Sequence, residues 1–272
     1  MEAMVAQLKT RCDALKTAGT QPCLTVLQVG NDPAAANYQA SIRRRADMVG
    51  VELRTLMLEE TSSLETVCDA IRGLNDDDSV HGVLLYLPLP GALHGHEAEV
   101  CACLKPEKDV DGVTEGSAAA VYQDRNTGFA PCTAEACLRL LEYYEVPMEG
   151  KTACVVGRSG VIGKPAAMLL LRRNATVTVA HSRTKDLSSV TSQADILIAA
   201  AGRAGLITGK HVKPGAVVVD VGANWDGEKI VGDVLFEEAE TVAEAVSPVP
   251  GGVGLLTSCV LMEHVIIAAE RK

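Results

Sequence analysis

Aromatic residues are scarce in this chain of 272 residues, where Phe, Trp and Tyr together make up 3%. The hydrophobic share is nevertheless 47%, so the core has to be built from Ala, Val, Leu and Ile, which suits helices packed on a buried parallel sheet. Basic residues are also few, with 25 Lys plus Arg against 35 Asp plus Glu and a net charge of -10. This balance argues against a nucleic-acid or anionic-membrane surface, since both need a net positive footprint.

Paired cysteines and long apolar runs are missing as well. The nine cysteines are odd in number and include no C-x-x-C pair, so we interpret them as reduced thiols of a cytoplasmic protein. Cys101 and Cys103 lie near His94 and His96, but the spacing is not that of a zinc site, and no metal is expected. Residues 1–16 are charged throughout, unlike a signal peptide, and no run approaches the ~18 apolar residues of a membrane span.

Short apolar runs alternate with helical patterns along the chain. Alternation of this kind predicts βαβ units and a parallel sheet, and a domain boundary is expected near residue 130. After the first strand, Asn31-Asp32-Pro33 is expected to start a helix. The expected strands are 23–30, 51–58, 81–87, 152–156, 175–180, 194–201 and 216–221; the expected helices are 34–48, 63–74, 133–144 and 255–272; and 105–116 is expected to be a loop.

A glycine-rich turn in the second half indicates a nucleotide site. Gly157, Gly160 and Gly163 follow the strand 152–156 and lead into a helix, with a further strand beginning 12 residues after Gly163. Glycines here let the backbone turn sharply and approach a pyrophosphate, which the helix N-terminus also attracts. The spacing is G-x-x-G-x-x-G rather than G-x-G-x-x-G, and its position between a strand and a helix favours a Rossmann dinucleotide site.

The end of the next strand favours NADP over NAD. An NAD site usually carries an acidic residue there, whereas this chain has His181-Ser182-Arg183-Thr184. Arg158, with Ser182 or Arg183, is expected to bind a 2′-phosphate through charge-assisted hydrogen bonds. The alternative is that both arginines are solvated loop charges. A second Pro and Gly cluster, at 247–254, suits close approach of the backbone to a ligand, although taken alone it is better explained by an ordinary turn.

These motifs, with several others in the same order, resemble the bifunctional 5,10-methylenetetrahydrofolate dehydrogenase/5,10-methenyltetrahydrofolate cyclohydrolase family, known in bacteria as FolD. The resemblance covers nearly the whole chain. It is carried by VGNDPAAANY (29–38), LPLP (87–90), KPEKDVDG (105–112), PCT (131–133), VVGRSGVIGKP (155–165), ATVTVAHSRT (175–184), the run 194–224, GDV (232–234) and SPVPGGVGLLT (247–257).

The resemblance implies an α/β fold with two domains. An N-terminal folate-binding and catalytic domain is expected over 1–130, with the helix 256–272 packing back on it, and a doubly wound NADP-binding Rossmann domain over 131–255, with the folate in the cleft between them. It also implies a homodimer formed through the Rossmann domains. The implied reactions are NADP-dependent oxidation of methylenetetrahydrofolate to the methenyl form and hydrolysis of that product to 10-formyltetrahydrofolate, both in one-carbon metabolism.

The resemblance further implies the site residues. Asp111 matches the carboxylate that holds the pterin ring, Tyr38 matches the catalytic tyrosine, and Thr133 lies at the nicotinamide end. The remaining substrate positions are Ile42, Tyr86, Leu87, Pro88, Pro250, Gly251 and Gly252, and the remaining cofactor positions are Gly157, Arg158, Ser159, Ile162, Ser182, Arg183, Gly202, Ala223 and Thr257.

Two positions depart from the family's catalytic pattern. The family has Y-x-x-x-K on one helix, which puts both side chains on one face, but the residue four after Tyr38 is Ile42. The family's glutamine partner of that lysine, in V-Q-L-P-L-P, is replaced by Tyr86. Arg43, the neighbour of Ile42, points about 100° away and cannot give up its proton near neutral pH.

The two reactions need different groups. Hydride transfer depends mainly on positioning, whereas hydrolysis needs acid–base help worth typically 10²–10⁴-fold. We therefore expect an NADP-dependent dehydrogenase with weak or absent cyclohydrolase activity. Tyr38 is expected to face the ligand, and Tyr86 either stacks on the pterin or fills the space beside Ile42.

Three alternatives remain open from the sequence. The first is a fully bifunctional enzyme in which Tyr38, Tyr86 or water moves the proton. The second is a non-catalytic folate-binding or NADP-binding protein, against which the intact glycine loop and Asp111 count. The third is another two-domain Rossmann oxidoreductase, such as a shikimate dehydrogenase, which would carry a Lys–Asp pair that we do not find.

Overall fold

The computed structural model describes residues 1–31 and 35–271, and these form two compact units. Unit 1 comprises Met1–Cys132 and Ser258–Lys272, and unit 2 comprises Thr133–Thr257. The sequence placed the two junctions at 130/131 and 255/256. Both units are α/β, the fold class expected from the alternating pattern. Asp32 and Pro33, which were expected to start a helix, lie outside the described residues.

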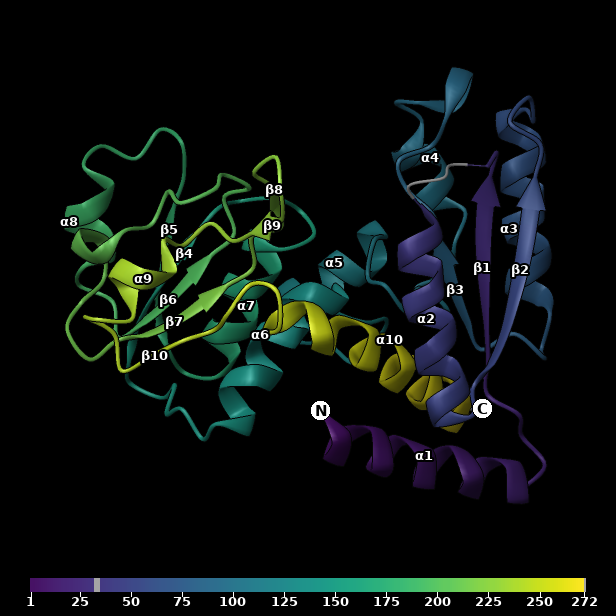
Figure 1. Cartoon of the computed structure of the whole chain (residues 1–272). Helices are drawn as coiled ribbons and strands as arrows, with labels where there is room; N and C mark the ends of the chain where they lie inside the picture. The colour runs from purple at the N-terminus through teal and green to yellow at the C-terminus, as the bar shows by residue number, and fades with distance from the viewer. Residues whose placement is uncertain (32–34, 272) are drawn as a thin grey trace. The chain divides into compact units, whose positions relative to one another are not determined.

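Unit 1 contains a three-stranded parallel sheet in the order β2-β1-β3 (Figure 1). The central strand β1 (Cys23–Val29) is buried along its whole length, which explains its unbroken apolar sequence. It pairs with β2 (Glu52–Leu58) on one side and β3 (Gly82–Leu85) on the other. All three strands therefore end at the same edge, where the chain continues into the segments that carry Tyr86 and Leu87-Pro88.

Side chains of one face of this sheet pack on α3 and α4. Leu27 and Val83 from the strands join Val67 and Ile71 of α3 and Val100 of α4 in one apolar cluster. The helix α3 begins at Ser63, whose hydroxyl accepts a hydrogen bond from the amide of Thr66. The helices of this unit are α1 (Glu2–Thr17), α2 (Ala35–Val49), α3 (Leu64–Asp76), η1 (Gly91–Leu93), α4 (Glu97–Ala102) and α5 (Glu115–Tyr122), with most of α10 (Val253–Glu270).

Unit 2 is built on a five-stranded parallel sheet in the order β10-β7-β6-β4-β5. The chain runs outward from β4 in both directions, which is the doubly wound arrangement, and the point where the order reverses lies between β4 and β6. The strands are β4 (Thr152–Val156), β5 (Thr176–Ala180), β6 (Ile196–Ala199), β7 (Val217–Asp220) and β10 (Ala245–Val246).

Helices and a small hairpin complete unit 2 (Figure 1). The hairpin pairs β8 (Asn224–Trp225) with β9 (Ile230–Val231) in antiparallel fashion. The helices are α6 (Cys132–Tyr143), which begins at the junction of the units, α7 (Gly163–Arg172), α8 (Leu187–Thr191), η2 (Gly209–His211) and α9 (Phe236–Ala239).

The helix α10 qualifies the expectation that no segment resembles a membrane span. By length and composition this 18-residue helix could cross a membrane, but 61% of it is buried within the protein, as in the core helix of a globular fold. Its apolar positions include Val260, Leu261 and Ile266, all of which are buried. Among the described residues it is the helix that meets this criterion.

Several elements differ from the sequence expectation at their ends. The helix expected at 255–272 begins at Val253, and α5 begins at Glu115 inside the loop expected over 105–116. The helix α1 was not expected, and neither were the hairpin β8–β9 and the edge strand β10. Strands of two residues carry no periodic pattern, so tertiary pairing defines them and the local sequence does not.

Candidate functional site

The glycine-rich turn of unit 2 packs at two points that leave no room for a side chain. A Cβ on Gly157, whose φ is +130°, would lie 2.0 Å from the carbonyl oxygen of Ala200 at the end of β6. A Cβ on Gly163 would lie 2.2 Å from the carbonyl oxygen of Gly157. The first and third glycines therefore bring β4, β6 and α7 close together, as a Rossmann turn requires.

The middle of the turn has a different role. A Cβ on Gly160 would meet no heavy atom within 4 Å, so this glycine faces open space. Beside it, the Ser159 hydroxyl accepts hydrogen bonds from the amides of Ile162 at 3.2 Å and Gly163 at 3.3 Å. An open backbone next to the first amides of α7 is an arrangement that suits the close approach of an anion.

A cavity of about 420 Å³ opens at the carboxyl ends of β4, β5 and β6. Basic and hydroxyl side chains face it from three loops, and none of the described residues that line it is acidic, which suits a phosphate. Four expected cofactor residues line it together: Gly157, Arg158, Ser159 and Ser182. Arg183 is not among its lining residues, and the amide of Arg183 instead bonds to the imidazole of His181.

Arg203 is a basic residue of this cavity that the sequence reasoning missed. It follows β6, and its amide donates a hydrogen bond of 2.8 Å to the buried carboxylate of Asp233. Gly202 donates to the same carboxylate at 2.9 Å, so this glycine orders the loop and does not line the cavity. An arginine after a strand gives no sequence signal of its own, because the carboxylate that fixes its loop lies 30 residues further along the chain.

Two buried aspartates, Asp220 and Asp233, order the loops at the carboxyl ends of β6 and β7 in unit 2. Asp220, at the end of β7, accepts hydrogen bonds from the amides of Gly222, Asp233 and Val234 at 2.9–3.0 Å. Burial raises the pKa of Asp220, and these amide hydrogen bonds act in the opposite direction. The pair holds the segment that carries the expected cofactor residue Ala223, which is exposed.

Two aromatic residues of unit 1 lie close together at the end of β3. The rings of Tyr38, on α2, and Tyr86 lie 6.4 Å apart with an interplanar angle of 46°. Tyr38 is 37% exposed, and Tyr86 and Leu87 are partly buried. The bond from Leu87 to Pro88 is cis, and Pro88 is exposed. These expected substrate residues thus form one cluster on a single unit.

Ile42 is a buried residue of α2, four positions after Tyr38. It was expected to line the substrate site at the position where the family has lysine, but its side chain is only 1% exposed. An isoleucine has no polar end to extend toward solvent, so it packs into the core of unit 1. That Ile42 borders the bound substrate stays a prediction.

Asp111 lies near Tyr38 and has an unusual ionisation. Burial raises its pKa to about 6; a hydrogen bond from the Cys132 thiol lowers it, the charge of Asp109 raises it, and that of His264 lowers it. The pKa of Tyr38 is raised too, first by burial and then by the charge of Asp111. The tyrosine is therefore a neutral hydroxyl near pH 7, whereas the carboxyl group can take up or release a proton there.

The remaining expected residues lie in unit 2 or at its junctions with unit 1. Pro250 follows a cis peptide bond and lines a second cavity of unit 2, about 770 Å³ in volume, beside β8–β9. Gly251 has a φ of +118°, and a Cβ on Gly252 would meet the carbonyl oxygen of Pro248 at 2.7 Å. Thr133 and Thr257 are the first and last residues of unit 2.

Possible metal ligands are not grouped in the described part of the chain. No three His, Cys, Asp or Glu side chains among residues 1–31 and 35–271 are close enough to hold a metal ion. His94 pairs with Glu97 at 3.6 Å and His96 with Glu99 at 2.8 Å, in each case three residues apart. None of the described cysteines forms a disulfide bond.

Comparison with known families identifies both parts of the chain. Residues 1–111 match the catalytic domain of tetrahydrofolate dehydrogenase/cyclohydrolase, and residues 131–272 match the NAD(P)-binding domain of the same family. The chain belongs to this family. A relative described as "Bifunctional protein FolD" from Carboxydothermus hydrogenoformans is 43% identical over 272 residues, covering 99% of this chain and 94% of the relative.

Solved structures of the family have the same fold. The bifunctional FolD dehydrogenase/cyclohydrolase from Campylobacter jejuni superimposes with a TM-score of 0.94 at 38% identity, covering 99% of this chain and 95% of that one. The FolD enzyme of Trypanosoma brucei, solved with NADP cofactor and an inhibitor, gives 0.91 at 31% identity, covering 99% and 94%. Shikimate dehydrogenase from Thermus thermophilus, at 18% identity and a TM-score of 0.53, shares the fold alone. The family assignment therefore excludes the alternative that the chain is a shikimate-type dehydrogenase.

Proposed function

We propose that the protein oxidises 5,10-methylenetetrahydrofolate to 5,10-methenyltetrahydrofolate with NADP, and that its cyclohydrolase activity is weak or absent. The observation that carries the proposal is the replacement of an ionisable side chain by buried Ile42 beside an otherwise retained site. The cavity at Arg158 and Ser182 supports NADP, and Tyr38 with Asp111 supports a folate.

The dehydrogenase step is mainly a matter of positioning. NADP, when bound, accepts the hydride that leaves the methylene carbon, while the lone pair of the adjacent ring nitrogen forms the new C=N bond. No side chain has to take a proton in this step. The protein holds the pterin through Asp111 and can cover one face with Tyr38 or Tyr86, while Arg158, Ser182 and Arg203 suit a 2′-phosphate.

Hydrolysis places a demand that this site meets poorly. Water must lose a proton as it attacks the methenyl carbon, and a ring nitrogen must gain one as the C–N bond breaks. Tyr38 keeps its proton near neutral pH, since the ordinary pKa of a tyrosine is about 10 and burial raises the pKa of Tyr38 further, and Ile42 offers no proton at all. The expected consequence is release of the methenyl compound as the main product.

A two-part assay on purified protein tests the proposal. NADP-dependent oxidation of methylenetetrahydrofolate is followed first, and the decay of added methenyltetrahydrofolate is then compared with its spontaneous rate. Oxidation without enzymatic decay is the expected result. Decay as fast as oxidation would contradict the loss of cyclohydrolase, and the lack of both activities would favour a non-catalytic binding protein.

A fully bifunctional enzyme is the second candidate. Asp111 favours it, because a carboxyl group with a pKa of about 6 can act as a base near neutral pH. The names of the FolD relatives point the same way. If decay is found, its loss in Tyr86→Phe would assign it to the phenol, and its persistence in that variant would favour the carboxylate of Asp111.

The residues of the two units divide between the ligands in this proposal. Unit 1 supplies most of the folate contacts, unit 2 supplies the others and binds NADP, and the protein acts in the cytoplasm with its cysteines reduced. The proposed folate contacts are Tyr38, Tyr86, Leu87, Pro88, Asp111, Pro250, Gly251 and Gly252. The proposed cofactor contacts are Thr133, Gly157, Arg158, Ser159, Ile162, Ser182, Arg183, Arg203, Ala223 and Thr257, with Gly202 supporting their loop.

A homodimer through unit 2 is part of the proposal. The hairpin β8–β9 supports it, because Trp225 and Ile230 are opposite each other in the register and are 69% and 49% exposed. Paired apolar side chains on a surface are typical of a protein interface. Light scattering on the intact protein and on Trp225→Glu tests it, and a monomer in both cases would exclude it.

A further inference from the structure

His264 is a buried histidine to which the proposed reaction gives no role. It lies on α10, is 2% exposed, and belongs to the same unit as Asp111. Its Nδ1 is 2.8 Å from the carbonyl oxygen of Val110, the residue directly before Asp111. Because a carbonyl oxygen only accepts, Nδ1 carries the proton and donates it to this bond.

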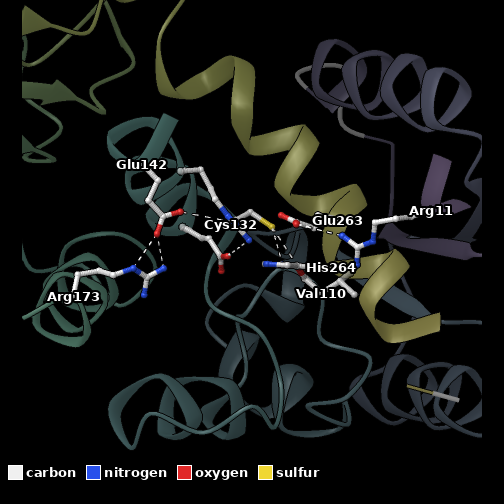
Figure 2. A network of polar contacts seen from close by, with 9 residues as sticks. Arg11, Val110, Cys132, Glu142, Arg173, Glu263 and His264 are labelled. Carbon is white, nitrogen blue, oxygen red and sulfur yellow. Dashed lines mark hydrogen bonds and ion pairs between the residues drawn. The ribbon is translucent and has the colours of Figure 1, made fainter. Parts of the chain in front are cut away.

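The same imidazole contacts the thiol next to Asp111. Cys132 Sγ lies 3.7 Å from His264 Nδ1 and 3.3 Å from the carbonyl oxygen of Val110, and Figure 2 shows the three side by side. Cys132 also lowers the pKa of the Asp111 carboxyl group, which places the thiol within interaction range of that side chain. His264 and Cys132 thus hold the backbone and the side chain of the Val110–Asp111 segment from one direction.

The imidazole is itself held rigidly. The imidazole packs on the ring of Phe129, with 4.7 Å between the two centroids. The guanidinium of Arg271 lies over the same phenyl ring, 4.6 Å from its centroid. Arg11 of α1 fixes α10 on either side of His264 through Glu263 at 3.5 Å and Glu270 at 2.7 Å. A histidine fixed in this way has one orientation available to it.

We propose that His264 is a positioning residue for the folate site: its hydrogen bond to the Val110 carbonyl and its contact with Cys132 fix the carboxylate of Asp111 in the orientation that binds the pterin. This inference rests on the proposed folate function. A pterin offers adjacent N–H donors, and a carboxylate can accept both only in one plane, so a small rotation of Asp111 loses one hydrogen bond.

The electrostatic effect of His264 gives the proposal a second signature. The charged and titratable groups around Asp111 are Asp109 on its own loop, Cys132 on α6, His264 on α10 and Tyr38 on α2. Of these, Cys132 and His264 favour the ionised carboxylate. Removing the imidazole therefore raises the pKa of Asp111, and folate binding then begins to fail at a higher pH.

Three variants separate positioning from general stability. His264→Leu removes the donor and keeps much of the volume, whereas His264→Asn retains an N–H close to the position of Nδ1. His81→Leu is the matched control, since His81 is buried at the other end of β3 and its Nδ1 accepts a hydrogen bond from the Cys23 amide at 3.2 Å. All three lose packing in unit 1, but only the first removes the donor at Val110.

The experiment measures binding of 5-formyltetrahydrofolate, a stable folate, together with KM for methylenetetrahydrofolate and for NADP. His264→Leu is expected to weaken folate binding and raise the folate KM roughly tenfold, with the KM for NADP unchanged. His264→Asn should restore most of the loss, and His81→Leu should leave both KM values unchanged. An unchanged folate KM in His264→Leu, or an equal rise in His81→Leu, would overturn the proposal.

A carboxyl NMR titration keeps this proposal separate from the proposed function. The Asp111 signal, assigned with Asp111→Asn, is expected to titrate near pH 6 in the native protein and about half a pH unit higher in His264→Leu. If the native protein binds no folate, the proposed function fails, and an unchanged Asp111 titration in His264→Leu would independently refute the role of His264.

Discussion

The cofactor crevice of unit 2, which is the cavity lined by Gly157, Arg158 and Ser182, depends mainly on backbone atoms. The aromatic site of unit 1, formed by Tyr38 and Tyr86 with Asp111, depends on side chains. In the crevice, backbone atoms make the critical contacts: Gly157 and Gly163 approach carbonyl groups, and Asp233 binds the amides of the loop carrying Arg203. In unit 1, the site depends on the side chains of Tyr38, Tyr86 and Asp111.

This difference determines how each site can change during evolution. A site made from backbone is tied to the fold, so most substitutions that damage it also damage the structure. A site made from side chains can lose one chemical step while the helix that carries it stays intact. Ile42 is the position at which we propose such a loss, because an apolar side chain packs there in a helix that stays intact.

The largest expected effect comes from adding to unit 1 the acid–base groups that we propose it lacks. Ile42→Lys combined with Tyr86→Gln supplies an ammonium group and an amide partner next to Tyr38. Because acid–base assistance is worth about 10²–10⁴-fold, we expect methenyltetrahydrofolate hydrolysis to rise by that order while oxidation changes little. The decay of methenyltetrahydrofolate measures it.

The matched control is Ile42→Met combined with Tyr86→Gln, because methionine at position 42 is a long side chain without a charge. An equal gain in this control would mean that space for water, and not a proton carrier, is what the native site lacks. No gain in either variant would contradict the proposal that Ile42 and Tyr86 limit methenyltetrahydrofolate hydrolysis.

The next largest effect tests the backbone-built site. Gly157→Ala places a Cβ 2.0 Å from the Ala200 carbonyl oxygen at a φ of +130°. We therefore expect the free energy of unfolding to fall by more than about 2 kcal/mol, and NADP binding to be lost as well. Gly160→Ala meets no atom within 4 Å and should weaken NADP binding without destabilising the protein. Urea unfolding and NADP titration compare the two, and similar unfolding free energies would contradict this account.

The contrast also explains what the sequence could predict. The glycine spacing, the strand–turn–helix order and the lack of an acidic residue after β5 located the crevice and four of the residues that line it, because backbone geometry leaves a pattern in the sequence. The parallel sheets and the fold class followed from alternating apolar runs in the same way.

Other features had no local signal. The anchoring of Arg203 by Asp233 and the contact of His264 with Val110 join residues 30 and 154 positions apart. The burial of Ile42 was also missed, since a helical position can face either a cavity or the core. Side-chain environment, not residue identity, decides these cases.

A smaller effect is expected at the phosphate end of the crevice. Arg158→Ala removes one cation from the cavity, so the KM for NADP should rise about 10-fold while the KM for NAD, which has no 2′-phosphate, stays nearly constant. Arg172→Ala, in the last turn of α7, removes an equal charge at the opposite end of the helix. Steady-state kinetics with both cofactors measure the ratio, and an equal loss with NAD would exclude a phosphate-specific role.

The smallest effect compares two carboxyl groups whose pKa values shift in opposite directions. Asp195 of unit 2 has a lowered pKa, chiefly because Lys213 binds it at 2.6 Å, so its contribution to stability is present at neutral pH and is lost as the pH falls. Asp111 has a raised pKa of about 6, so the folded protein becomes less stable as the pH rises from about 4 to about 6 and this carboxyl ionises.

Asp111→Asn should therefore stabilise the protein while it abolishes folate binding. The neutral amide has no ionisation cost. The free energy of unfolding of the variant should therefore exceed that of the native protein by on the order of 1–2 kcal/mol at pH 7, and by almost nothing at pH 4. Asp195→Asn should do the reverse and lower stability most at pH 7. Urea unfolding at both pH values gives the two differences. If Asp111→Asn is less stable than the native protein at pH 7, the interaction of the carboxylate with Cys132 outweighs the cost of burying the charge. In that case Asp111 does not destabilise the fold.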